Sequence, residues 1–319
     1  MNFSLATAAL KNLKSHGYVV VDNVLPEAVA YNYFNEILNV AEVNQKLLTK
    51  NSTILKYKEK TFFFDKPNIG EFDLSVEKVR AALPKIHSYL NDYSLMHLLN
   101  TLDLFPHSKN EFFSQTVKAQ INFGNNGCFP IHLDADYLNL DDKRTVTSIL
   151  YLNDLSDDGG GEIVLYPFPY KKIIVKPKFN RYENEFVTQL LIVTRMVLFS
   201  SKFCFHRVLK TKEPRICLTK WISTENPLKY DDASLELEDS LCLPQNRIYV
   251  SKVLLKDEWR LSLKESQLEN CSTILIDNLK NDIKIIENKL QKIKNFQTVF
   301  KNFLSETKDE SNNLKIKYF

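Results

Sequence analysis

The sequence predicts a mainly β protein with flanking helices, built on a double-stranded β-helix (jelly roll) and extended by a long C-terminal amphipathic helix. Five of the seven glycines fall between Gly124 and Gly161, at turns that bound short apolar runs, as a compact all-β barrel requires. Near the C-terminus, apolar residues recur instead at steps of three and four, which is the period of a helix. The hydrophobic content of 44% in 319 residues is enough to bury a full core.

These patterns divide the chain into three parts. We expect an N-terminal helical and strand support at 1–117, the β core at 118–225, and a linker with a helical segment at 226–319. The formal net charge of +3 is a mild excess without basic clusters, so nucleic acid is not an expected partner. The five cysteines form no CxxC pair, which indicates reduced thiols. Without a basic signal-peptide start or a long apolar run, the chain is predicted to be cytoplasmic or nuclear, with no membrane partner.

The N-terminal part has the pattern of a scaffold. Residues 5–17 have helical spacing and end on a glycine suited to a C-cap, and 18–22 is a β-rich run. A helix at about 26–40 is expected from the proline at its first turn. Residues 61–65 are strand-like, and 74–104 has helical spacing around one proline. The histidines of this region stand in no HxD or HxH pair, so no role is assigned to them: His87, His97 and His107.

Within the expected core, short apolar runs separated by turn residues predict the strands of the jelly roll. After an opening segment at 118–127, these runs are Thr147–Leu152, Glu162–Tyr166, Met196–Phe199 and Ile216–Trp221. Polar residues near their ends are the candidates for chemistry.

Two histidines and one aspartate have the pattern of a metal site. His132 and Asp134 lie two positions apart, and on an extended strand such residues point to the same face. His206 follows in a second apolar stretch. Two imidazoles and one carboxylate on one face make the facial triad of a non-haem Fe(II) site, which leaves three coordination positions open. Zinc more usually has four ligands, or three within a hydrolase pattern that this sequence lacks.

An arginine after the second histidine favours iron over zinc. Arg215 opens a strand-like run and shares its face with Cys217 and Thr219. A guanidinium beside the iron suits the distal carboxylate of a dicarboxylic acid, through bidentate pairing. The keto-acid end of that molecule would then chelate the metal. This arrangement resembles that of 2-oxoglutarate-dependent dioxygenases.

An ordered set of motifs from Lys118 to Ser223 resembles the prolyl 4-hydroxylase-like branch of that superfamily, especially the hypoxia-type prolyl hydroxylases and related protist and algal proteins. The set consists of His132-x-Asp134, Arg144–Asn153, Gly159–Pro167, Phe199–Ser201, His206–Val208 and Arg215-x-x-x-Thr219-x-Trp221. The resemblance implies Fe(II) at the triad, 2-oxoglutarate and O2 as co-substrates, and ascorbate as a further candidate cofactor. It implies no catalytic residue beyond the metal ligands.

The resemblance also suggests roles for single residues. Tyr151 matches a tyrosine whose hydroxyl meets the distal carboxylate of 2-oxoglutarate, and it could equally be a core aromatic of its strand. Thr219 matches a threonine beside Arg215. Asp136 falls beyond the family pattern and is expected to be a loop carboxylate. Residues 57–64 are a candidate wall of the substrate groove.

Two departures from the family pattern bear on the pocket. Asn122 stands where the hypoxia-type enzymes place a second tyrosine against the co-substrate, so the pocket is expected to hold 2-oxoglutarate with a different polarity or strength. Residues Asn180 to Thr194 form an insertion, which is expected to be a loop. The insertion either flanks the substrate entrance or decorates an edge.

The C-terminal part begins with an acidic linker at 231–238. From Ile276 to Leu304, apolar residues form a heptad seam, and polar residues fill the other faces. A helix with this seam either folds back against the domain, which we favour slightly, or forms a coiled coil with a partner or a second copy. The last residues, from Ser305, are charged and expected to be frayed.

The expected function is oxidative hydroxylation of a C–H bond, with release of succinate and CO2. The resemblance favours a prolyl residue of a protein or peptide as the substrate. Another side chain or a small molecule is the alternative, because a fold does not determine its substrate. A non-catalytic scaffold that recruits a partner through the C-terminal helix is the alternative of another class.

Overall fold

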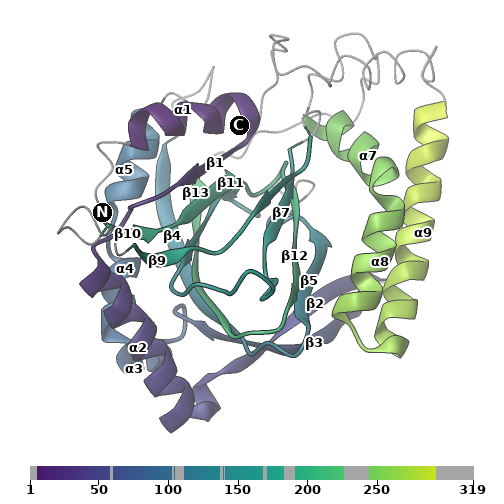
Figure 1. Cartoon of the computed structure of the whole chain (residues 1–319). Coiled ribbons are helices and arrows are strands. Elements are labelled where there is room, and N and C mark those ends of the chain that lie inside the picture. Colours follow the sequence, from purple (N-terminus) through teal and green to yellow (C-terminus); the bar gives the residue numbers. More distant parts are fainter. Residues whose placement is uncertain are drawn as a thin grey trace.

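Two antiparallel β-sheets face each other, with helices on both sides of them (Figure 1). The structure, a computed structural model, describes residues 6–57, 60–102, 104, 111–136, 139, 141–167, 171–182, 191–225 and 244–291. The predicted acidic linker, His107 and the seam beyond residue 291 lie outside the described residues. The mainly β fold with flanking helices is confirmed.

The larger sheet has seven strands among the described residues. Their order is β1 (Tyr18–Val21), β11 (Met196–Ser200), β6 (Arg144–Tyr151), β13 (Arg215–Thr224), β4 (Phe112–Asn122), β3 (Lys60–Asp73) and β2 (Thr49–Tyr57). The four-stranded sheet has the order β5 (Gly127–His132), β12 (Phe205–Thr211), β7 (Ile163–Tyr166) and β8 (Ile173–Val175). The strands predicted within 118–225 all lie in these two sheets. The larger sheet also takes β1, β2 and β3 from the expected N-terminal support, and β4 crosses the expected boundary at residue 117.

Alternation along the strands of the larger sheet separates two cores. Leu218 on β13 points outward into the same core as Leu13 and Ile37 of the N-terminal helices. Cys217 points to the other face, into the core between the two sheets, which also contains Leu165 of β7. Because successive side chains of a strand alternate, residues of β13 an even number of positions from Cys217 also face the space between the sheets.

The N-terminal helices cover the outer face of the larger sheet (Figure 1). They are α1 (Ala6–His16), α2 (Glu27–Val43), the 3-10 turn η1 (Gln45–Leu47), α3 (Glu77–Ala82), α4 (Pro84–Leu90) and α5 (Ser94–Asn100). Gly17 ends α1 as predicted, with φ at 74° and its N–H bonded to the Leu13 carbonyl at 3.0 Å. The helical spacing of 74–104 corresponds to three short helices, because Pro84 begins α4 and lacks the N–H that would continue α3.

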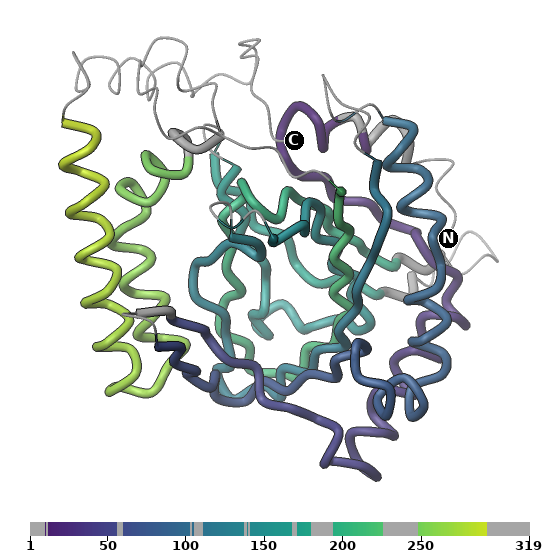
Figure 2. The backbone as a smooth tube through the Cα atoms, turned by 180° about the vertical axis from the view of Figure 1, so that it is seen from behind, coloured from purple at the N-terminus to yellow at the C-terminus, as the bar shows by residue number. Residues whose placement is uncertain are grey.

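Of the C-terminal helices, α7 and α8 lie on the outer face of the smaller sheet, and α9 lies against α8 on the side away from the sheet (Figures 1 and 2). They are α7 (Pro244–Leu254), α8 (Lys256–Ser266) and α9 (Glu269–Gln291). Trp259 of α8 contacts Phe205 of β12 edge to face, at 5.2 Å between ring centres. Ser262 of α8 accepts a hydrogen bond from the Ile131 N–H of the edge strand β5 at 3.0 Å. This contact satisfies a backbone donor that the edge of the sheet would otherwise leave unpaired.

Helix α9 is folded back, which is the alternative that the sequence slightly favoured. Its seam residues Ile276, Leu279 and Ile283 are buried with Leu263 of α8. Phe64 at the β2–β3 hairpin belongs to the same cluster, and Gln267 donates to Thr53 of β2 at 3.0 Å. The apolar side of α9 is therefore occupied by its own chain as far as Leu290. No described helix is both long and apolar enough to cross a membrane.

Replacing Ile283 with alanine is expected to lower the free energy of unfolding by about 2–4 kcal/mol, because the change leaves a cavity beneath α9. Ile283 is 6% exposed, whereas Ile285 on the same helix is 57% exposed. The matched Ile285→Ala variant should therefore change stability by less than about 0.5 kcal/mol. Urea denaturation of both variants measures the difference. Equal effects at the two positions would contradict the folded-back packing of α9.

The insertion at 180–194 differs from the predicted loop at its two ends. These ends pair as β9 (Phe179–Tyr182) and β10 (Leu191–Thr194), and residues 183–190 lie outside the described residues. The Thr194 hydroxyl donates to the Leu25 carbonyl at 3.1 Å and accepts from the Leu25 N–H at 2.9 Å. Arg195 pairs with Asp22 at 2.7 Å. The described ends of the insertion are thus attached beside the β1–α2 connection.

Candidate metal centre

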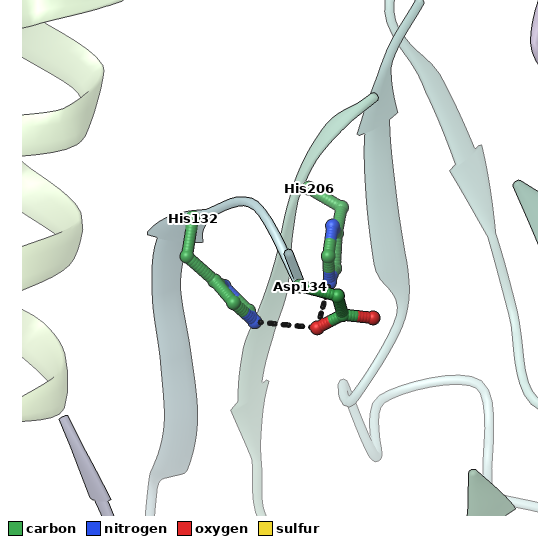
Figure 3. Close-up of side chains that lie close together, drawn as sticks. All are labelled: His132, Asp134 and His206. Carbon is green, nitrogen blue, oxygen red and sulfur yellow. Dashed lines mark ion pairs between the residues drawn. The ribbon is translucent and has the colours of Figure 1, made fainter. Parts of the chain in front are cut away.

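Two of the three candidate ligands face each other across neighbouring strands. His132 ends β5, His206 lies near the start of β12, and the two residues are direct partners in the antiparallel register. Their ring centres are 4.2 Å apart. Asp134 lies two residues past the end of β5, in a bend, so the prediction that it shares a strand face with His132 is wrong. The bend brings its carboxylate to the same point (Figure 3).

The ligand atoms of the three residues converge. Oδ1 of Asp134 is 3.5 Å from Nε2 of His132 and 3.5 Å from Nε2 of His206. One ligand atom from each residue lies within 4.8 Å of the others. The side chain of His132 is 35% exposed and that of His206 is 4% exposed, so the group opens to solvent on the His132 side.

Backbone carbonyls set the tautomer of both histidines. Nδ1 of His132 is 2.8 Å from the Pro130 carbonyl, and Nδ1 of His206 is 3.2 Å from the Cys204 carbonyl. A carbonyl oxygen only accepts, so each Nδ1 carries a proton and Nε2 is the nitrogen of each ring that can bind a metal. When both Nε2 atoms are deprotonated, two nitrogen lone pairs and a carboxylate oxygen meet, and a cation between them would relieve their repulsion.

The ionisation of the group suits a metal. Burial by itself would raise the pKa of the Asp134 carboxyl, but His206 and His132 outweigh burial and hold this pKa well below its usual range. Burial, with His206 close by, lowers the pKa of His132. Near neutral pH the carboxylate is therefore ionised and the His132 ring is neutral, which are the forms that bind a metal.

Arg215 lies in the same pocket as the three ligands, on the inner face of β13. Its side chain is 2% exposed, and Nε and Nη2 have no hydrogen-bond partner among the described residues. The Tyr151 hydroxyl is likewise buried without a partner, and the guanidinium lies 5.0 Å from the centre of the Tyr151 ring. Its Nη1 donates to the Cys217 sulfur at 3.4 Å. A buried guanidinium with two unpaired nitrogens is costly unless an anion binds it. A carboxylate bound between Arg215 and Tyr151 would satisfy these donors.

Gln120, which no sequence motif indicated, also lines this pocket. On β4, Gln120 is directly opposite Cys217, and Cys217 is directly opposite Tyr151 on β6. The amide oxygen of Gln120 accepts from the Thr219 hydroxyl at 3.2 Å and from the Cys217 thiol at 3.7 Å. Gln120 lies two residues before Asn122 and therefore on the same strand face, which is the one sequence signal that would have predicted a place for Gln120 in the pocket.

The side chain of Asn122 bonds within the turn between β4 and β5. Its amide nitrogen donates to the Gly127 carbonyl at 2.8 Å, and its amide oxygen accepts from the Gly124 N–H at 3.2 Å. Asn125 and Asn126 have positive φ values of 50° and 64° in the turn that Asn122 spans. The Asn122 side chain therefore holds the β4–β5 turn together, and it is absent from the described lining of the pocket.

The other residues considered in the sequence belong neither to the described group of three candidate ligands nor to the described lining of the pocket. Asp136 is exposed and does not belong to the described metal-ligating group, in keeping with a loop carboxylate. In the expected groove wall, Phe63 is 66% exposed and Phe64 packs on α9. His87 and His97 lie on α4 and α5, at the outer face of the larger sheet.

Comparisons with known proteins agree with this geometry. Residues 118–223 match the family model of the 2OG-Fe(II) oxygenase superfamily. A search of curated protein sequences finds no match. Among solved structures, a prolyl 4-hydroxylase from Phytophthora capsici is 24% identical, with a TM-score of 0.68 over 94% of this chain and 91% of that chain.

Two further solved structures are similar over the core. A prolyl hydroxylase from Trichoplax adhaerens, in complex with a peptide fragment of the hypoxia inducible factor oxygen degradation domain, is 20% identical. Its TM-score is 0.51, over 69% of this chain and 89% of that chain. A prolyl-4-hydroxylase from Pseudomonas putida is 18% identical, with a TM-score of 0.50 over 68% of this chain and 97% of that chain. Residues 118–223 thus match the family model of the 2OG-Fe(II) oxygenase superfamily, and the chain has a fold like that of the prolyl 4-hydroxylase from Phytophthora capsici.

Proposed function

We propose that this protein is an Fe(II)- and 2-oxoglutarate-dependent dioxygenase that hydroxylates a prolyl residue of a protein or peptide. The observation that carries the proposal is one pocket lined both by the converging His132, Asp134 and His206 and by Arg215, whose Nε and Nη2 are buried without partners. The buried hydroxyl of Tyr151, also without a partner, belongs to the residue whose ring lies beside that guanidinium. The first group suits a cation, and the second suits a carboxylate. A dicarboxylic keto acid bound to iron would use both.

Each residue has a separate task in this proposal. His132, Asp134 and His206 hold Fe(II) from one side and leave the opposite positions open. Arg215 and Tyr151 bind the distal carboxylate of 2-oxoglutarate, with Thr219 beside them. Fe(II), O2 and 2-oxoglutarate together supply the oxidation, in which the keto acid becomes succinate and CO2 and the substrate gains one oxygen atom. No further side chain has to move a proton.

Apolar side chains complete the pocket and limit the access of water. Phe129, Ile149, Val208 and Trp221 line it beside the candidate ligands, and Phe129 stacks near His132 at 6.3 Å between ring centres. Exclusion of water strengthens the ion pair between Arg215 and a bound carboxylate. An apolar wall beside the metal also suits a C–H bond of an aliphatic ring better than a charged group.

The prolyl substrate rests on similarity. The motifs of the chain follow the prolyl-hydroxylase branch, and all three similar structures described above are named prolyl hydroxylases, one of them in complex with a peptide. Another side chain or a small molecule is the alternative substrate. A non-catalytic scaffold is less favoured, since it has no use for a buried Arg215 whose Nε and Nη2 lack partners. Ascorbate, and a cytoplasmic or nuclear location, stay predictions.

Proline-containing peptides are expected to raise succinate production above the uncoupled background and to gain one oxygen atom on the proline ring. Peptides from a cell extract, treated with the active enzyme or with the His206→Ala variant, would be compared by mass spectrometry. For each modified peptide, a synthetic copy with alanine in place of the proline is the matched control. Oxygen found only on other residues, or only on metabolites, would refute the prolyl substrate and leave the dioxygenase chemistry standing.

A further inference from the structure

We infer that Thr147 and Trp221 are positioning residues that restrict Asp134 to a single metal-binding oxygen, an inference that rests on the proposed metal site. The two oxygens of this carboxylate have different partners. Oδ1 faces Nε2 of both candidate histidine ligands at 3.5 Å. Oδ2 accepts a hydrogen bond from the Thr147 hydroxyl at 2.7 Å and another from the Trp221 indole N–H at 3.1 Å.

The two donors belong to the rigid sheet, whereas Asp134 lies in a bend. Thr147 on β6 and Trp221 on β13 are direct partners in the antiparallel register, so their side chains leave the same face side by side. Both are buried, with exposed fractions of 0% for Thr147 and 9% for Trp221. The positions of the two donors are therefore set by strand pairing and not by the bend that they hold.

Further contacts orient each donor. The Thr147 hydroxyl donates its one proton to the carboxylate, so in its contact with the buried Ser201 hydroxyl, 2.8 Å away, it is the acceptor. The Arg144 guanidinium lies 5.9 Å from the centre of the Trp221 ring. Asp142 holds that guanidinium with two hydrogen bonds, at 2.9 and 2.6 Å. The indole is thus fixed at its polar edge by Asp134 and on its face by Arg144.

This arrangement has a chemical consequence for the metal. A carboxylate binds a metal ion through one oxygen or through both. Binding through both would occupy one of the three positions that the proposed reaction needs, two for the keto acid and one for O2. Turning Oδ2 toward the metal would break two hydrogen bonds to a charged acceptor, each of which is stronger than a neutral one. Thr147 and Trp221 therefore keep the third position free.

The test uses Mn(II) as the probe, without 2-oxoglutarate or turnover. Dissociation constants for Thr147→Val, Trp221→Phe and the double variant would be measured by electron paramagnetic resonance. Water-proton relaxation would count the water molecules on the bound Mn(II). Each single variant is expected to weaken Mn(II) binding about 10- to 100-fold, as is usual when an outer partner of a ligand is removed. The double variant should also hold fewer water molecules on the metal than the wild type.

The chain offers matched controls. Thr145 lies two residues earlier on β6 and bonds to the Thr224 hydroxyl at 2.9 Å, and Trp259 lies on α8 as the second of the two tryptophans. Thr145→Val and Trp259→Phe should leave Mn(II) affinity and hydration unchanged. Thr147→Ser keeps the hydroxyl that Thr147→Val removes, so its Mn(II) affinity and hydration should equal those of the wild type. Thermal melting confirms that each variant is folded.

The possible results distinguish a failure of this inference from a failure of the proposed metal site. If the folded single variants bind Mn(II) with wild-type affinity, or if the double variant holds as many water molecules on the metal as the wild type, the inference is overturned. An equal loss of affinity in the control variants would overturn it as well, because the loss would then reflect general packing. A wild-type protein that binds no Mn(II) would refute the metal site itself.

Discussion

Replacing His132 or Asp134 with alanine is expected to reduce 2-oxoglutarate turnover with Fe(II) to the uncatalysed background. A site with three protein ligands has no spare ligand, and only these three side chains converge within 4.8 Å among the described residues. The measurement is succinate production under saturating Fe(II), together with Fe(II) binding under anaerobic conditions. The fold should persist, since the strands β5 and β12 keep their backbone pairing in both variants.

Two control positions make this result specific. His97 is an exposed histidine on α5, and Asp136 is an exposed carboxylate two residues beyond Asp134. Alanine at either control position should leave Fe(II) binding and turnover at the wild-type level. Wild-type succinate production by His132→Ala or Asp134→Ala would show that the ligand assignment is wrong.

Replacing Arg215 with lysine or methionine is expected to weaken 2-oxoglutarate binding far more than Fe(II) binding. Removal of one partner from a buried, hydrogen-bonded charge pair costs about 2–5 kcal/mol, which corresponds to roughly 30- to 5,000-fold in the dissociation constant. Lysine keeps the charge but loses the planar fork that pairs with a carboxylate, so it should not restore the affinity. Anaerobic titration of the Fe(II)-loaded protein with 2-oxoglutarate measures the effect.

The melting temperature of the protein without 2-oxoglutarate provides a second test, because Arg215→Met should not lower it. Since Nε and Nη2 of Arg215 are buried without partners, Arg215→Met should melt at the same temperature as the wild type or higher when no 2-oxoglutarate is present. Addition of 2-oxoglutarate should raise the melting temperature of the wild type only. An unchanged affinity for 2-oxoglutarate in both variants would place its anchor elsewhere.

A second buried arginine serves as the control. Arg207 on β12 points to the opposite side from His206 and donates to Glu265 of α8 at 2.6 Å. Arg207→Met breaks a structural ion pair, so it should lower the melting temperature while 2-oxoglutarate affinity stays at the wild-type level. The two arginines therefore separate a binding role from a structural role by opposite changes in the same two measurements.

Local patterns in the sequence were sufficient for most of the strands and for the choice of candidate ligands. Glycine-bounded apolar runs predicted the strands because turn residues and alternation act over a few residues. The residues His132, Asp134, His206 and Arg215 were distinguishable by type and order. Even the error about Asp134 was local, because the strand ends at His132 and a bend, not the pleat, directs the carboxylate.

Tertiary structure alone decided which residues surround these candidates. Gln120 and Trp221 line the pocket, and Thr147 reaches Asp134, because β4, β6 and β13 pair in one particular register. A shift of one residue would turn each of these side chains to the other face. That register depends on contacts between segments far apart in the chain. The heptad seam in the sequence likewise predicted that α9 has an apolar side. Only the structure shows that Leu263 and Phe64, from two distant elements, cover that side. An apolar face specifies only that it must be buried, and the rest of the fold supplies the partner.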